Sequence, residues 1–188
     1  MLRGMARDRP RIKPALAAGF LLAAASWHPA RADEVDDALA ALAEAEAGHE
    51  QIAERARKAW SRSGSDAMDY LLRRGREAIE AEDWPTAIGH LTALTDHAPD
   101  FAEGFNARAV AYFRSGLTGP ALADIERTLA LEPRNFDAVA GLGFVLLDTG
   151  DEEAALRAFR EAARLNPGLE EVNEAIAELE KATGGSAL

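Results

Sequence analysis

The sequence contains few side chains whose types and spacing could perform catalysis or hold a metal ion. It has no cysteine, which excludes disulfides, thiolate ligands and a thiol nucleophile. His90 and His97 are seven residues apart and share one face of a predicted helix, but Asp96 and Asp100 near them give no recognised metal-ligand spacing. We therefore interpret these histidines as exposed polar residues, and we expect neither a metal nor a cofactor.

Other patterns that can signal catalysis have simpler structural explanations. Gly141 and Gly143 lie inside a predicted helix, so they do not form a phosphate-binding loop. The serines lie in predicted turns, without a histidine and an acid in a matching context. Nothing in the pattern brings two carboxylates together in a dry cleft. We expect that the chain is not an enzyme.

Composition and charge favour a globular protein with an acidic surface. The 188 residues are 48% hydrophobic and 28% charged, and the net charge is −11. Nucleic acid and anionic membranes are poor partners for such a surface.

Residues 1–32 have the pattern of a cleaved secretory signal. Basic residues are followed by an apolar run from Ala15 to Trp27, and Ala30 and Ala32 flank Arg31. As a helix, that run would be about 20 Å long against roughly 30 Å of bilayer hydrocarbon, so an anchor is the poorer explanation. We expect cleavage after Ala32, a periplasmic protein and no stable membrane insertion of the mature chain. An uncleaved tether is the alternative.

Cleavage would make the protein more acidic. The leader holds six of the 21 basic residues and one of the 32 acidic residues, which leaves 15 positive and 31 negative side chains, a net charge of about −16.

The helices that would position any functional surface are indicated by a repeat. Pro99, Pro133 and Pro167 recur at intervals of 34 residues, and small and bulky residues keep a fixed distance from them. Such alternation is typical of helices that cross closely, because a small residue on one helix admits an apolar side chain of its neighbour. Counting back 24, 12 and 8 positions from each proline gives Gly75, Ala109 and Gly143, then Ala87, Ala121 and Ala155, then Leu91, Ile125 and Phe159.

In these residues the chain resembles the tetratricopeptide repeat (TPR) family, over roughly its central half. The resemblance implies an all-α fold, a right-handed α-solenoid of three helix pairs. Arg74 and Arg108 occupy positions where the family has leucine, so either their stems pack while the guanidinium reaches water, or a carboxylate partner lies nearby. The residues shared with the family pattern are Gly75, Ala87 and Pro99, then Tyr112, Ala121 and Pro133, then Leu142, Gly143, Ala155, Phe159 and Pro167.

The expected domain organisation follows from the repeat. After the leader comes an N-terminal helical extension, residues 33–65, and then a TPR domain, residues 66–182. Its repeats cover about 68–101, 102–135 and 136–169, and a capping helix covers 169–182, before a mobile tail at 183–188. We expect the cap to turn a polar outer face to solvent, formed by Glu170, Glu171, Glu174, Glu178 and Glu180.

The resemblance also implies a binding surface, because the first helix of each pair lines the concave face of such a stack. An apolar face of this kind can accept an amphipathic helix or an extended peptide. Alternatively it is core, covered by the chain's own residues 33–60. The predicted partner-binding residues are Leu72, Arg76, Ile79, Asn106, Val110, Phe113, Phe144 and Leu147.

One specialised use of this face is not expected. Some family members grip the C-terminal carboxylate of chaperone tails with lysine, asparagine and arginine at set positions. The matching residues here are Leu72, Arg76, Ala107, Asp137 and Gly141, of which only Arg76 could serve.

The chain also resembles small periplasmic TPR proteins of alphaproteobacteria, which implies an adaptor role. We therefore expect a non-catalytic scaffold that binds a protein or peptide partner through its concave face, in a cell-envelope assembly. The alternative is a periplasmic carrier that holds a small ligand, such as a lipid or muropeptide, in the apolar groove.

Overall fold

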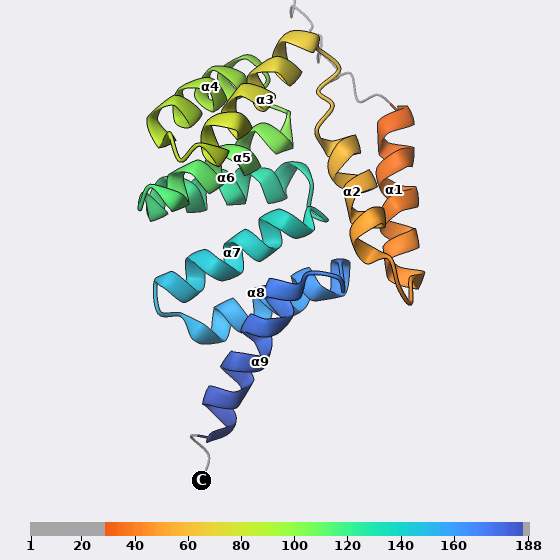
Figure 1. Ribbon diagram of the computed structural model, residues 1–188, viewed down its shortest axis with the longest axis vertical. Helices are drawn as coiled ribbons and strands as arrows, with labels where there is room; N and C mark the ends of the chain where they lie inside the picture. The colour runs from red at the N-terminus through yellow and green to blue at the C-terminus, as the bar shows by residue number, and fades with distance from the viewer. Residues whose placement is uncertain (1–28, 186–188) are drawn as a thin grey trace, which may run out of the picture.

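The computed structural model describes residues 29–185, with side chains for residues 33–182. This part of the chain is entirely helical, so the predicted all-α solenoid is confirmed (Figure 1). The helices are α1 (Pro29–Glu44), α2 (His49–Trp60), α3 (Asp66–Glu80), α4 (Trp84–His97), α5 (Ala102–Arg114), α6 (Thr118–Leu131), α7 (Phe136–Asp148), α8 (Glu152–Leu165) and α9 (Glu170–Gly185).

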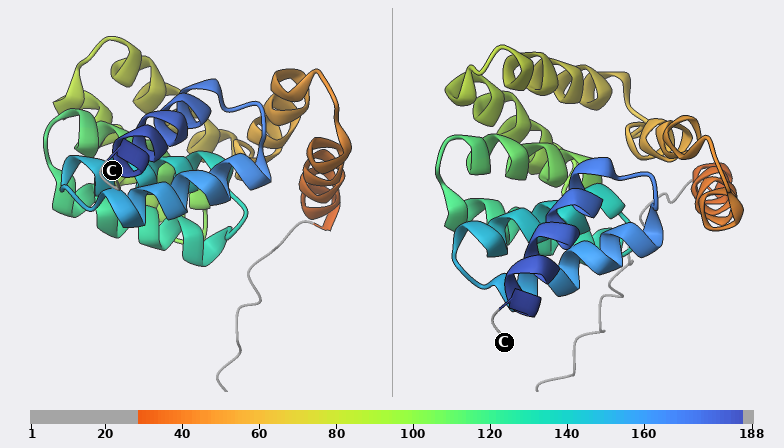
Figure 2. Two further views of the ribbon diagram at one scale, coloured as in Figure 1. Left: turned by 90° about the horizontal axis from the view of Figure 1, so that it is seen from below. Right: turned by 60° about the horizontal axis from the view of Figure 1, so that its bottom comes forward.

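Three antiparallel pairs, α3 with α4, α5 with α6 and α7 with α8, stack in chain order. Figure 1 shows the stack, with the α1–α2 hairpin standing along one edge of it. Helix α9 packs on α8 and covers the end of the last pair, as both views of Figure 2 show.

Each pair crosses where the repeat places a small residue. A methyl group on Gly143 would lie 2.4 Å from Cε1 of Phe159, and one on Gly75 would lie 2.5 Å from Cγ of Leu91. In the middle pair Ala109 and Ile125 share one buried cluster. The predicted insertion of a bulky side chain opposite a small residue is therefore confirmed.

Arg108 does have a carboxylate partner. Its Nε donates to Oδ2 of Asp124 at 2.7 Å, its Nη2 donates to Oδ1 at 2.8 Å, and its Nη1 donates to Oγ1 of Thr95 at 2.7 Å. The two charged side chains are only 14% and 8% exposed. Arg74, by contrast, pairs with Glu77 on the same helix at the surface.

The N-terminal extension folds as the α1–α2 hairpin, with its own apolar core, and docks on the start of α7. Trp60 meets Phe136 edge to face, with ring centroids 5.0 Å apart. The loop before α9 also lies close to the hairpin, since a methyl group on Gly168 would lie 2.4 Å from Cβ of His49. The hairpin core consists of Val35, Ala38, Leu42, Ala53, Ala56, Ala59 and Trp60.

The ends of the chain bear on two sequence predictions. Most of the expected leader, residues 1–28, lies outside the described residues, and α1 begins at Pro29, so residues 30–32 are in its first turn. Residues 183–185 of the expected tail extend α9 to Gly185, while 186–188 lie outside the described residues. Among residues 29–185, no helix combines the length and apolar character needed to cross a bilayer.

Gly143→Ala should lower the free energy of unfolding by about 1–3 kcal/mol, because the added methyl overlaps the ring of Phe159 in a packed crossing. Urea unfolding measures the change. Gly89→Ala is the matched control: it lies within α4 with nothing within 4 Å of the new methyl, and should raise stability by about 0.5–1 kcal/mol. Similar effects of both substitutions would contradict the crossing.

Asp124→Asn should lower stability by about 2–4 kcal/mol, because it leaves the guanidinium of Arg108 without a counter-charge in a mostly buried site. Glu153→Gln breaks the exposed Arg157–Glu153 pair, and this control should cost less than about 0.5 kcal/mol. Thermal unfolding of both variants makes the comparison. A silent Asp124→Asn would show that Arg108 is hydrated.

Candidate functional site

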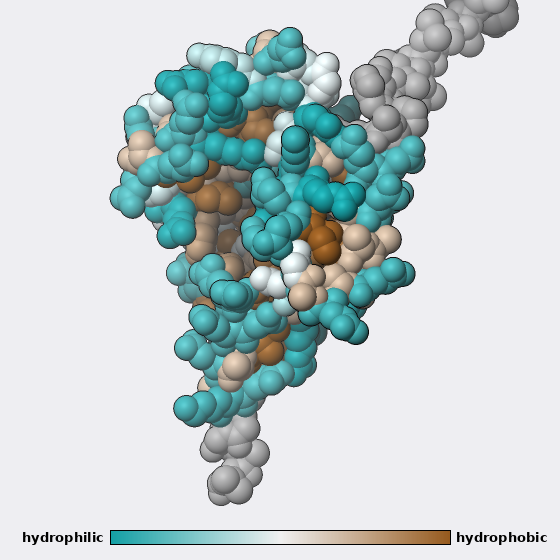
Figure 3. Space-filling view, turned by 45° about the vertical axis from the view of Figure 1, so that its right-hand side comes forward, coloured by the Kyte–Doolittle hydropathy of each residue, from teal (hydrophilic) through white to brown (hydrophobic). Residues whose placement is uncertain are grey.

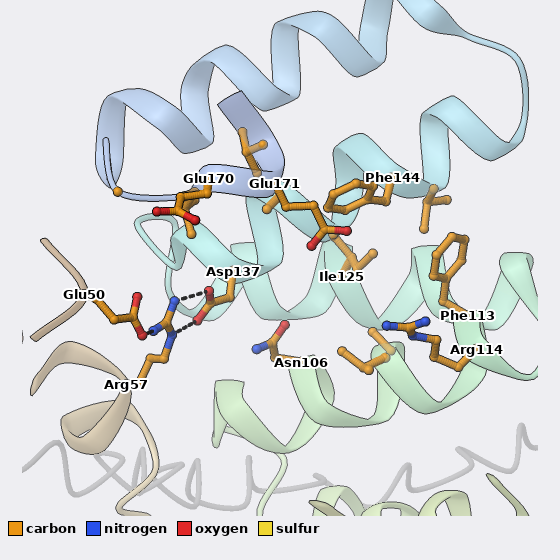
Figure 4. A pocket seen from close by; sticks show the side chains of 18 residues that line it. Glu50, Arg57, Asn106, Phe113, Arg114, Ile125, Asp137, Phe144, Glu170 and Glu171 are labelled. Atoms are coloured by element: carbon orange, nitrogen blue, oxygen red, sulfur yellow. Dashed lines mark hydrogen bonds and ion pairs between the residues drawn. The ribbon is translucent and has the colours of Figure 1, made fainter. Parts of the chain in front are cut away.

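A cavity of about 700 Å³ opens on the concave side of the stack, between α5, α7, α2 and the start of α9 (Figure 4). This volume is in the range of sites that bind small molecules or peptide side chains. The space-filling view shows the surface hollowed, with hydrophobic residues inside the hollow and hydrophilic residues around it (Figure 3). We call the cavity the concave pocket.

The floor of the concave pocket is apolar because α5 and α7 each turn an apolar face toward it. The floor residues of each helix are spaced three and four apart, and Val110 of α5 and Phe144 of α7 occupy the same place in successive repeats. Val110 is 41% exposed, so this face is not filled by the chain itself. The floor residues are Ala109, Val110 and Phe113 of α5, Ala140, Gly141, Phe144 and Val145 of α7, and Ile125 of α6.

The rim of the concave pocket is charged and mostly acidic. Four carboxylates and two guanidinium groups line it. In Figure 4 most of the carboxylates gather toward α2 and the start of α9, whereas Arg114 lies below Phe113, on the far side of Asn106 from Arg57. The charged rim residues are Glu50, Arg57, Arg114, Asp137, Glu170 and Glu171.

Arg57 fixes the wall that α2 provides. Its Nε donates to Oδ2 of Asp137 at 2.9 Å, its Nη2 donates to Oδ1 at 3.1 Å, and its Nη1 donates to Oε1 of Glu50 at 3.0 Å. The guanidinium also lies over the ring of Phe136, 5.2 Å from its centroid. Burial by itself would lower the pKa of Arg57, but the hydrogen bonds and charge of Asp137, with help from Glu50, raise it.

Asn106 is a polar residue that lines the pocket, and a hydrogen bond to Glu103 sets the orientation of its side chain. It is 8% exposed, and its Nδ2 donates to Oε2 of Glu103 at 3.2 Å. Glu103 also accepts from Arg76 and from Nδ2 of Asn135. Because a carboxylate takes the amide N–H groups, the amide oxygen of Asn106 is turned to the pocket, as Figure 4 shows.

Glu103 itself is a buried acid at the base of this network. Burial raises its pKa above the usual value, and the charge of Asp137 adds to the effect, although Arg76 and Asn106 oppose it. The carboxyl group joins α3, α5 and the start of α7, so it holds the acidic end of the pocket together.

Half of the predicted partner-binding residues line the concave pocket: Asn106, Val110, Phe113 and Phe144. Leu147 does not, because it packs into the cluster beneath α9.

The three predicted residues of the first repeat lie elsewhere. Leu72 is 2% exposed and belongs to the core between α3, α4 and α5, and Ile79 packs against that core. Arg76 pairs with Glu103 and donates to Oγ of Ser61 at 2.9 Å. The apolar floor of the pocket therefore belongs to the second and third repeats.

Sequence reasoning missed most of the rim. Glu50 and Arg57 come from the N-terminal extension, which forms one wall of the pocket and leaves the floor open. Glu170 and Glu171, expected on the outer face of the cap, line the pocket instead. The position of Arg114 at the pocket could have been predicted, because it lies four residues after Val110 on the same helix face.

The described part of the chain contains no cluster of three or more His, Cys, Asp or Glu side chains suited to a metal ion. His97 is exposed and His90 is half-buried.

Comparison with known proteins agrees with this architecture. A sequence model described as Tetratricopeptide repeat matches residues 72–119 and 120–170. A TPR repeat-containing protein of Rhizobium etli is 33% identical over 116 residues, which cover 62% of this chain and 57% of that protein. The match thus spans little more than half the length of that relative.

Solved structures share the fold. The Sgt2 TPR domain from Aspergillus fumigatus aligns with a TM-score of 0.61 at 22% identity, over 65% of this chain and 83% of that one. The first TPR domain of Spaghetti (RPAP3), bound to the HSP90 peptide SRMEEVD, aligns with a TM-score of 0.60 at 22% identity, over 64% of this chain and 95% of that one. The matched sequence model covers more than half of the chain. The chain belongs to the tetratricopeptide repeat family.

Proposed function

We propose that this protein is a non-catalytic scaffold that binds a segment of a partner protein in the concave pocket. The observation that carries the proposal is the open apolar floor formed by α5 and α7, on which Val110 remains 41% exposed. An apolar surface with a polar rim is the kind of site that accepts a helix or an extended peptide.

Structural relatives support this use of the fold. The RPAP3 domain is bound to an HSP90 peptide, and the TPR2B domain of yeast Sti1 is in complex with pHsp70. These domains are about one-fifth identical to this chain, so they support peptide binding as a mode of action and do not identify the partner.

We also place the protein in the periplasm, within a cell-envelope assembly. This part of the proposal rests on the leader-like pattern of residues 1–32 and on the absence of cysteine from the sequence. Processing after Ala32 would leave α1 with a free N-terminus shortly before its buried Val35.

A photoreactive benzoylphenylalanine in place of Val110 should cross-link a discrete partner in living cells, because position 110 is on the floor of the pocket and faces its open space. The matched control replaces Leu117, which is 47% exposed but lies at the turn between α5 and α6, outside the pocket. Immunoblotting and mass spectrometry identify the adducts. The proposal fails if both positions give the same adducts, or if position 110 gives none.

A second function, a carrier of a lipid or muropeptide, is favoured by one observation, the volume of the pocket. About 700 Å³ is enough for a small ligand. The open, charged rim argues against it, since a carrier encloses most of the surface of an apolar ligand.

Native mass spectrometry separates the two functions. For a peptide-binding scaffold, the protein purified from the periplasm should have the mass of residues 33–188 alone. A reproducible extra mass that is lost on denaturation would support the carrier. The mass of residues 1–188 would instead overturn cleavage after Ala32.

A further inference from the structure

The polar groups at the α2–α9 end of the concave pocket are mostly hydrogen-bond acceptors. The amide oxygen of Asn106 has no partner among the described residues, and its side chain is more than nine-tenths buried. Glu170 and Glu171 line the same end and form no ion pair within the described part of the chain. A ligand that satisfies these acceptors must bring N–H or O–H donors.

The cation already present at this end is engaged by the protein's own carboxylates. Arg57 is held by Asp137 and Glu50 in a three-point arrangement. Counting Glu50, Asp137, Glu170 and Glu171 against Arg57, this end carries three more negative than positive side chains. A lysine or arginine of the ligand would find complementary charge here.

The opposite end of the pocket has the opposite charge. Arg114 ends α5, eight residues after Asn106, which is about 12 Å along the helix. It has no ion-pair partner among the described residues. The pocket is thus polarised, with acceptors at one end, an apolar floor at Val110 and Phe144, and a cation at the other.

Resting on the function proposed above, we infer that the concave pocket selects a peptide segment with a lysine or arginine next to apolar side chains, the cation lying against Asn106, Glu170 and Glu171. The apolar side chains occupy the floor between α5 and α7. A second copy of this chain is a poor occupant, because its net charge of −11 opposes the acidic rim. A peptide with a net negative charge, such as SRMEEVD, is a poor occupant for the same reason, although it contains one arginine.

Selection from a displayed library of random dodecapeptides on the purified protein tests the inference. Twelve residues span about 18 Å as a helix and more when extended, which exceeds the roughly 12 Å along α5 from Asn106 to Arg114. A parallel selection uses Val110→Trp, which fills the floor without changing charge. Peptides that depend on the open floor should contain a lysine or arginine beside apolar residues.

Charge variants then locate the cation. Fluorescence anisotropy with the selected peptides should show that Glu170→Gln/Glu171→Gln weakens binding on the order of fivefold, as expected for two exposed charges. Glu174→Gln/Glu178→Gln removes the same charge from α9 outside the pocket, and should weaken binding less than about twofold. Arg114→Gln should strengthen binding by about twofold, because it removes a like charge.

The outcomes distinguish this inference from the function on which it rests. Selected peptides that need the open floor but are acidic or uncharged would overturn the inference and keep the scaffold function. Equal losses in the two glutamate double variants, or weaker binding with Arg114→Gln, would also overturn it. No enriched peptide, or binding unchanged by Val110→Trp, would overturn both.

Discussion

The whole architecture depends on one contact within each helix pair, between a residue with little or no side chain and a bulky apolar residue sixteen positions later. At Gly143 and Phe159 there is no room even for a methyl group. This contact fixes how the two helices of a pair cross, and its repetition after 34 residues sets the first helices of successive pairs side by side. As a result, Val110 of α5 and Phe144 of α7 occupy equivalent places and join into one floor.

The same spacing explains which parts of the structure could be predicted from sequence. The crossings and the floor follow from the period. The sixteen-residue spacing also explains why the two arginines at leucine positions have different partners. Asp124 lies sixteen residues after Arg108, so an ion pair forms inside the crossing. Sixteen residues after Arg74 comes His90, which offers no negative charge, and Arg74 turns to Glu77 of its own helix.

The walls of the pocket could not be predicted, because they come from segments outside the repeat. The hairpin has no periodic partner, and its position is set by the edge-to-face contact of Trp60 with Phe136 and by the hydrogen bond from Arg57 to Asp137. Both contacts join residues more than 70 positions apart. The prediction placed Glu170 and Glu171 on the outer face of the cap for a related reason. The apolar stripe of a capping helix can be predicted from its sequence. What its first turn faces depends on the segment that lies beside the end of the stack, here the hairpin and the pocket.

Charge affects peptide binding to this protein at two distances. The net charge of −11 attracts a cationic segment from afar and raises its encounter rate, without choosing among cations. The choice is made at contact, where the buried Glu103 holds the amide of Asn106 so that its oxygen faces the pocket. The RPAP3 domain shares the fold with an acidic peptide bound. Since the crossings fix the floor independently of the rim, a change in the rim charges is enough to change the charge of the peptide that such a stack accepts.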